Sequence, residues 1–199
     1  MPDIEGHGWE LKVTRLGLQH RADQVPPVRT YSAYQLFIDG EEAPLAGHIC
    51  ERTGPGDNTK NGVHKHLRIH EGRYRLRTHF GTDYRSVGFG MTSDPPRPGI
   101  GVLDTGARTF ILLHPGHPPH LYVSSIGCLN PTKPLTDNAL IDFAESRDRV
   151  IALLDSLKAH DPAPFAHDKV GTPTPIADAW LVVDGEPMGP VSGPDTPVG

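Results

Sequence analysis

The residues of this chain whose types and spacing could perform chemistry lie between His114 and Asn130. Cys128 follows Gly127 in the stretch Ser124-Ser125-Ile126-Gly127-Cys128-Leu129-Asn130, and His114 ends an apolar run fourteen residues before the cysteine. A thiol with a pKa near about 8.5 is only weakly ionised at neutral pH, and a neighbouring imidazole or backbone N–H groups increase its nucleophilicity. Because glycine allows a sharp turn, the Gly127-Cys128 amides could form an oxyanion hole. These residues predict acyl transfer, with Cys128 as nucleophile and His114 as general base.

The pattern around Cys128 resembles the active-site motif of the L,D-transpeptidase (YkuD-like) catalytic domain family. In that family Ser/Thr-His-Gly-Cys-hydrophobic-Asn or Arg follows a histidine by a comparable interval, and the matching residues here are His114, Ser125, Gly127, Cys128, Leu129 and Asn130. The resemblance implies that Ser125, Gly127 and Asn130 shape the loop and the oxyanion site. This chain has Ile126 where the family often has histidine, and Pro115 where Gly or Ser usually follows the upstream histidine.

The same resemblance implies a substrate and a reaction. The substrate would be a peptidoglycan stem peptide, whose third-residue carbonyl the thiolate attacks to expel D-alanine and form an acyl-enzyme. An amine acceptor then gives a cross-link, water gives carboxypeptidase activity, and the cross-bridge of a neighbouring stem gives endopeptidase activity. No cofactor is implied. Two alternatives stay open: a catalytically inactive peptidoglycan- or peptide-binding module on the same fold, and a metal-binding protein built on a histidine cluster.

A second group of histidines contains candidate metal ligands. His64 and His66 would share one face of a strand, while His70 would lie farther along that face. No Cys-x-x-Cys or His-Glu-x-x-His pattern accompanies them. A solvated or substrate-lining basic face is therefore favoured, and no metal site is assigned.

Several residues around the motif are predicted to line the substrate groove. The spacing of His114, His117 and His120 would suit a helix, but the intervening prolines exclude one and favour a loop. The predicted groove-lining residues are His117, His120, Tyr122 and Ile126. Tyr122 is equally compatible with a core position.

The composition restricts the class of protein. A chain of 199 residues suits a single domain, predicted over residues 1–184, followed by a Pro/Gly-rich tail over residues 185–199. The net charge of −5 argues against nucleic acid as a partner, and no apolar run is long enough for a membrane span. The N-terminus lacks the features of a signal peptide, so synthesis in the cytoplasm is expected, with export by a non-Sec route if the substrate is the cell wall. Both cysteines are expected to be free thiols, with Cys50 buried.

The pattern of apolar residues and breakers predicts the elements. A continuous apolar run predicts a central strand over residues 109–114. Helical spacing of apolar residues predicts a helix over residues 138–159, capped by Thr136 or Asp137. Trp9 and Trp180 are predicted to pack in the core or at an edge. The other predicted strands cover residues 9–16, 31–38, 45–52, 73–80 and 179–184. Together these elements predict a mainly β fold, an antiparallel β sandwich or open barrel of L,D-transpeptidase type, with one packed C-terminal helix.

Overall fold

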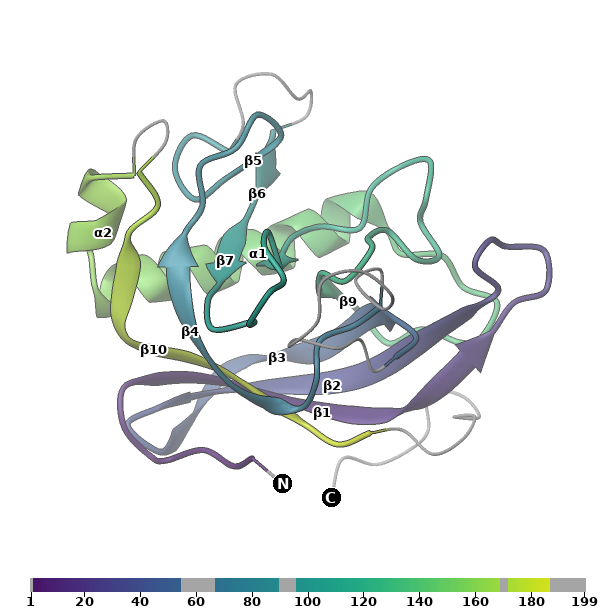
Figure 1. Cartoon of the computed structure of the whole chain (residues 1–199), viewed down its shortest axis with the longest axis horizontal. Helices are drawn as coiled ribbons and strands as arrows, with labels where there is room; N and C mark the ends of the chain where they lie inside the picture. The colour runs from purple at the N-terminus through teal and green to yellow at the C-terminus, as the bar shows by residue number, and fades with distance from the viewer. Residues whose placement is uncertain (1, 55–66, 90–95, 169–171, 187–199) are drawn as a thin grey trace.

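The computed structural model describes residues 2–54, 67–89, 96–168 and 172–186 of the chain, and its main feature is one large β sheet (Figure 1). Its elements in chain order are β1 (Trp9–His20), β2 (Val28–Ile38), β3 (Glu41–Arg52), β4 (Gly72–Thr78), β5 (Tyr84–Arg85), β6 (Arg97–Pro98), β7 (Ile100–Val102), β8 (Leu112–Leu113), β9 (Asn130–Thr132), α1 (Phe143–His160), α2 (Ala163–Ala166) and β10 (Pro175–Asp184). Eight strands form the main sheet in the order β8-β7-β4-β10-β1-β2-β3-β9, and β5 pairs with β6 separately. β1 pairs in parallel with β10 and antiparallel with β2, so the sheet is mixed.

The two ends of the sheet meet, so the strands form a nearly closed barrel. β8 and β9 are the first and last strands of the sheet, and Leu113 of β8 forms a parallel bridge with Leu129, directly before β9. Closure of this kind leaves fewer unpaired backbone groups at the sheet edges. The predicted mainly β fold with one packed C-terminal helix is confirmed, although its pairing is mixed rather than purely antiparallel.

The core lies between the sheet and α1, which runs behind β4 and β7 in Figure 1. Alternation along β1 points Trp9, Leu11 and Val13 to the inner face, where all three are fully buried. They belong to the same cluster as Leu153 and Leu157 of α1. Burying one such side chain contributes about 1.5–3 kcal/mol, so this contact fixes the helix on the sheet.

The main helix begins later than its sequence predicts. α1 starts at Phe143 because the side chain of Asp142 accepts a hydrogen bond from the Glu145 N–H over 3.1 Å and caps the helix. The predicted cap at Thr136 or Asp137 and the predicted start at residue 138 are therefore wrong. Leu140, which falls within the predicted helix, lies outside α1 and is exposed.

The predicted central strand over residues 109–114 is also wrong. Only Leu112–Leu113 form a strand, and this strand is the first in sheet order. Phe110 has a φ of +61°, which breaks an extended conformation, and its side chain is 71% exposed. The apolar run reflects the burial of its second half, where Ile111, Leu112 and Leu113 are buried.

The remaining predictions on packing are confirmed where the structure describes them. Cys50 is a buried free thiol, and Trp9 is fully buried with its indole N–H donating to Ser156 Oγ over 2.9 Å. Trp180 lies beneath the Arg73 guanidinium, 4.3 Å from the ring centre. Of the predicted tail, Glu186 pairs with the buried Arg15, and residues 187–199 lie outside the described residues.

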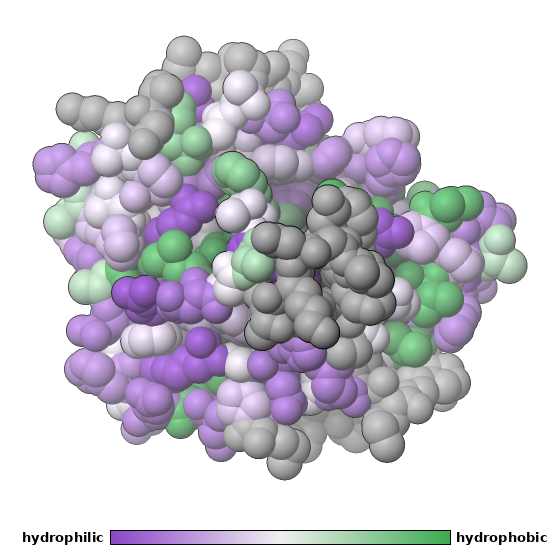
Figure 2. All heavy atoms as spheres, in the orientation of Figure 1, coloured by the Kyte–Doolittle hydropathy of each residue, from purple (hydrophilic) through white to green (hydrophobic). Residues whose placement is uncertain are grey.

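The surface carries no dominant hydrophobic area on the face shown in Figure 2. Coloured residues there are mostly hydrophilic, and the hydrophobic ones form small separate groups. Among the described residues, the large hydrophobic side chains with high exposure are dispersed along the chain: Val25, Val87, Phe110, Ile126 and Leu140. No helix within the described residues is long and apolar enough to cross a membrane.

Candidate active site

The predicted nucleophile and base lie on two neighbouring segments where the barrel closes. The His114 N–H donates to the Leu129 carbonyl over 3.1 Å, and the Leu129 N–H donates to the Leu112 carbonyl over 2.9 Å. In this parallel register Cys128 lies across from Leu112, whereas His114 lies across from Asn130. The fold therefore brings the two residues to the place where segments 112–114 and 128–130 pair, which we call the seam. Asn130 is the direct cross-strand neighbour of the histidine there.

The Cys128 thiol is half-buried and surrounded by backbone groups. Its S–H donates to the Phe110 carbonyl oxygen, 3.5 Å from Sγ. Burial raises the pKa of the Cys128 thiol to about 11, while the Leu112 N–H and the Arg108 guanidinium lower it. The thiol is therefore protonated at neutral pH in this state of the site.

Gly127 holds a conformation and a contact that exclude a side chain. Its φ of +141° lies in the region that favours glycine. A Cβ at this position would lie 2.1 Å from Arg108 Nη2 and 2.9 Å from the Leu67 carbonyl oxygen. The Gly-Cys turn is thus packed directly against a guanidinium. Arg108 could not be identified from the sequence, because no local pattern around residue 108 signals a contact made through the closure of the barrel.

His114 is buried, and a backbone carbonyl orients its ring. Nδ1 lies 2.8 Å from the Pro115 carbonyl oxygen, and because a carbonyl only accepts hydrogen bonds, Nδ1 carries the proton. Asn130 Nδ2 lies 3.3 Å from the same nitrogen but donates to the His114 carbonyl oxygen over 2.9 Å. The lone pair of Nε2 is therefore the one that can accept a proton.

The surroundings of His114 keep its imidazole neutral. Burial lowers the pKa of His114 to about 3, and the charges of His117, Arg97 and His79 act in the same direction. The hydrogen bond to Pro115 opposes this shift. At neutral pH Nε2 therefore carries no proton, so this nitrogen can accept a proton but cannot donate one.

In this state the thiol and the imidazole do not form a hydrogen-bonded pair. The hydrogen bond of Cys128 goes to Phe110, and the polar contacts of the His114 ring go to Pro115 and Asn130. Within the described part of the chain, no hydrogen bond joins Sγ to the ring. At rest both the thiol and the imidazole are neutral.

Ser125 and Asn130 support the loop that carries the thiol. Ser125 Oγ donates to the Cys128 carbonyl over 2.9 Å and closes the turn, while Asn130 ties this segment to His114. The N–H groups of Gly127 and Cys128 donate to no other described residue. These contacts are compatible with the loop-shaping roles implied by the resemblance, and the oxyanion role stays a prediction.

Helix α1 holds the site from outside through one buried hydroxyl. Ser146 Oγ accepts a hydrogen bond from the Gly116 N–H over 3.0 Å, and it donates to the Pro131 carbonyl. Gly116 follows His114 by two residues, and Pro131 directly follows Asn130. The hydroxyl therefore links both strands of the seam to the helix.

Tyr84 of β5 packs on the predicted base and was not identified from the sequence. Its ring centre lies 4.4 Å from that of His114 and 6.0 Å from that of His117. Burial raises the pKa of the Tyr84 phenol to about 12, and Arg97, which hydrogen-bonds the phenol, opposes this shift. The Cys128 thiol also acts on this phenol, so one tyrosine lies close to both members of the predicted pair.

The other predicted groove-lining residues lie in different environments. His117 is half-buried beside His114, whereas His120 is exposed. Ile126 is 57% exposed next to the Gly-Cys turn. Of the two positions open to Tyr122, the structure shows the interior, with its ring 4.3 Å from the Arg29 guanidinium carbon.

Metal ligation finds no support in the described part of the chain. No group of three or more His, Cys, Asp or Glu side chains there is arranged to hold a metal ion. His64 and His66 lie outside the described residues. His70 is exposed, and its carbonyl accepts a hydrogen bond from the Tyr74 hydroxyl over 2.8 Å.

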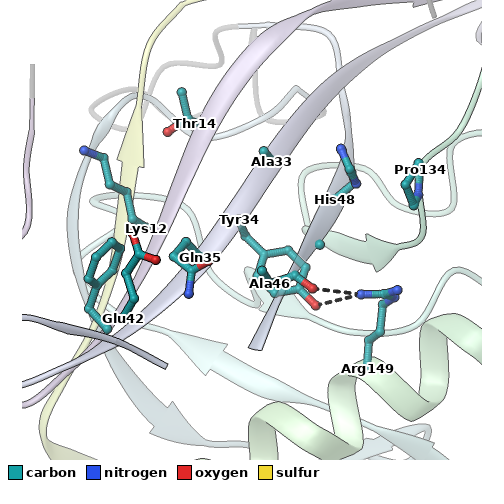
Figure 3. Close-up of a pocket in the computed structure, with 12 residues that line it drawn as sticks. Lys12, Thr14, Ala33, Tyr34, Gln35, Glu42, Ala46, His48, Pro134 and Arg149 are labelled. Atoms are coloured by element: carbon teal, nitrogen blue, oxygen red, sulfur yellow. Dashed lines mark hydrogen bonds between the residues drawn. The ribbon is translucent and has the colours of Figure 1, made fainter. Parts of the chain in front are cut away.

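A separate cavity of about 670 Å³ lies over β1, β2 and β3 (Figure 3). Arg149 reaches it from α1 and donates to the Tyr34 hydroxyl over 3.3 Å. The two cationic side chains of the cavity lining are paired with carboxylates, Arg149 with Glu145 and Lys12 with Asp3. The lining therefore shows no preference for an anion. The lining residues are Lys12, Thr14, Ala33, Tyr34, Gln35, Phe37, Glu42, Ala46, Gly47, His48, Pro134 and Arg149.

Comparison with known proteins adds no relative. No family model, no curated protein and no solved structure matches this chain.

Proposed function

We propose that this protein catalyses cysteine-dependent acyl transfer or hydrolysis on a peptide, with peptidoglycan stem peptides as the substrate class. The observation that carries the proposal is the seam itself. A half-buried thiol on a glycine turn is carried by one of two paired segments, and the other carries a buried imidazole whose Nε2 lone pair can accept a proton. The motif resemblance around Cys128 supplies the substrate class.

The reaction begins when Sγ of Cys128 forms a bond to the carbonyl carbon of the scissile peptide. The thiol proton moves to Nε2 of His114, and the negative charge develops on the carbonyl oxygen, beside the N–H groups of Gly127 and Cys128. The C–N bond then breaks, and the imidazolium returns its proton to the leaving amine. An amine or a water molecule next forms a bond to the thioester carbonyl carbon and gives a proton to Nε2 of His114. The C–S bond then breaks, and this proton passes to Sγ, which restores the thiol.

Proton transfer must accompany the attack in this mechanism. The pKa values of Cys128, about 11, and His114, about 3, lie far apart. Forming the thiolate–imidazolium pair before the attack is therefore strongly unfavourable. Concerted transfer avoids most of this cost, because the sulfur loses its proton while it gains its bond to carbon.

Mass spectrometry of the full chain after incubation with purified muropeptides tests the proposal. We expect a covalent adduct on Cys128 or altered muropeptides. Cys128→Ser should abolish both, and Cys50→Ala should behave as the unsubstituted chain, because Cys50 is buried away from solvent.

The same experiment separates the alternative of an inactive binding module. Muropeptides that bind but stay unmodified, with equal binding by Cys128→Ala, would replace catalysis by binding. Neither binding nor an adduct would remove peptidoglycan as the substrate class.

A further inference from the structure

Arg108 is held rigidly against the turn that carries the predicted nucleophile. Its backbone N–H donates to the Thr105 carbonyl over 3.2 Å, and Thr105 Oγ1 donates to the Arg108 carbonyl over 2.6 Å. Its Nη2 donates to the Leu67 carbonyl, and the residue is buried. An arginine fixed at both its backbone and its guanidinium keeps its charge in one place.

The guanidinium occupies the space that a side chain at residue 127 would fill. The position of a Gly127 Cβ lies 2.1 Å from Arg108 Nη2, so the charge lies against the residue that directly precedes Cys128. The Arg108 charge acts on the half-buried Cys128 sulfur through little intervening solvent. Its interaction with an anionic sulfur is therefore stronger than that of a surface cation.

The other groups around the sulfur carry no positive charge before the attack. The His114 imidazole is neutral, the Tyr84 phenol would add only negative charge on ionisation, and the Phe110 carbonyl favours the protonated thiol. The Leu112 N–H contributes a dipole only. Among the described groups that act on Cys128, Arg108 is the one that carries a full positive charge.

We infer that Arg108 is the cation that stabilises negative charge on Cys128 Sγ as it attacks the substrate. The inference rests on the proposed function, since it names the residue that makes this thiol reactive. It also gives a second reason for glycine at position 127, because any side chain there would displace the guanidinium. Ile126 beside the turn is apolar and cannot provide the charge.

The pH dependence of Cys128 alkylation by iodoacetamide, followed peptide by peptide by mass spectrometry, tests this role in the full chain. Arg108→Gln and Arg108→Met should shift the profile upward by about one pH unit or more, which lowers the alkylation rate at a fixed alkaline pH about tenfold. Arg108→Lys keeps the charge and should stay within about threefold of the unsubstituted chain. Circular dichroism identifies any variant that does not fold.

Arg77→Gln is the matched control. Arg77 packs over Gly101 much as Arg108 packs over Gly127, with its Cγ 2.7 Å from the position of a Gly101 Cβ. We expect its substitution to leave the Cys128 profile unchanged. Equal losses in Arg108→Lys and Arg108→Gln would overturn the inference in favour of a packing role, and so would an unchanged profile in folded Arg108→Gln and Arg108→Met.

Failure of this inference is distinguishable from failure of the proposed function. A shifted alkylation profile without any muropeptide adduct on the unsubstituted chain supports the role of Arg108 at the thiol and contradicts the peptidoglycan activity. An adduct together with an unchanged profile in folded Arg108→Gln contradicts the role of Arg108 and supports the activity.

Discussion

Asn130 Nδ2 lies 2.9 Å from the carbonyl oxygen of His114 and donates a hydrogen bond to it. The bond joins the first residue of β9 to the residue that follows β8, so one side chain bridges the two ends of the sheet. Because the amide donates to the backbone and not to the ring, it fixes the position of His114 without occupying Nε2. The seam therefore serves both barrel closure and the predicted chemistry.

Replacing Asn130 by alanine should weaken the closure. The His114 carbonyl would lose its donor in a buried place, which costs about 1–3 kcal/mol. Urea unfolding of Asn130→Ala measures this loss. Asn138→Ala removes an exposed amide outside the site and should change the free energy of unfolding by less than about 0.5 kcal/mol. Equal stability of the two variants would show that the bridge contributes nothing.

Gly127→Ala should lower the free energy of unfolding by more than the positive φ alone explains. The new Cβ would lie 2.1 Å from the Arg108 guanidinium, so steric overlap adds to backbone strain, for a total of about 3 kcal/mol or more. Gly88→Ala is the matched control, because Gly88 has a φ of +69° and nothing within 4 Å of its Cβ position. We expect about 1–2 kcal/mol for that variant. Thermal unfolding that gives both variants the same loss would argue against the overlap.

The long strands could be predicted from the sequence because runs rich in apolar, β-branched and aromatic residues are separated by breakers. β1 is the clearest case, with Trp9, Leu11 and Val13 fully buried along its inner face. The prediction of a central strand over residues 109–114 was wrong because a continuous apolar run indicates burial but not strand pairing. Phe110 leaves the extended region at a φ of +61°, and no local pattern reveals that.

The site was predictable only in part. The Gly-Cys turn and the upstream histidine could be identified because they follow a compact motif. Arg108 and Tyr84 could not, since their relation to Cys128 arises from how β5 and the segment before β8 pack around the seam. Closure of the barrel between Leu113 and Leu129 is likewise a long-range pairing that spacing alone does not indicate.

Ser146→Ala should destabilise the seam from the helix side. The substitution leaves the Gly116 N–H without its acceptor and the Pro131 carbonyl without its donor, and one such buried group costs about 1–3 kcal/mol. Denaturant unfolding measures the loss, and Asp148→Ala on the exposed face of α1 is the control. If the seam depends on this hydroxyl, amide hydrogen exchange at Leu129 should also accelerate in Ser146→Ala. Unchanged exchange there would separate helix docking from seam stability.

The stability of the protein should fall as the pH drops below about 6.5, the ordinary pKa of histidine, because burial lowers the pKa of His114 to about 3 in the folded chain. Between these two values the unfolded chain binds a proton that the folded chain does not. The contribution of His114 is therefore fully present above about pH 6.5 and is lost as the pH falls toward about 3, at about 1.4 kcal/mol for each pH unit.

Urea unfolding of the His114→Gln variant between pH 4 and pH 6 isolates this contribution from that of His79, whose pKa burial also lowers, to about 4. The slope of unfolding free energy against pH should decrease by about 1.4 kcal/mol per pH unit relative to the unsubstituted chain. His120→Gln is the control, because the exposed His120 side chain meets solvent in both the folded and the unfolded chain. An unaltered slope in His114→Gln would mean that this imidazole binds a proton equally in the folded and the unfolded chain, which would contradict the lowering of its pKa by burial.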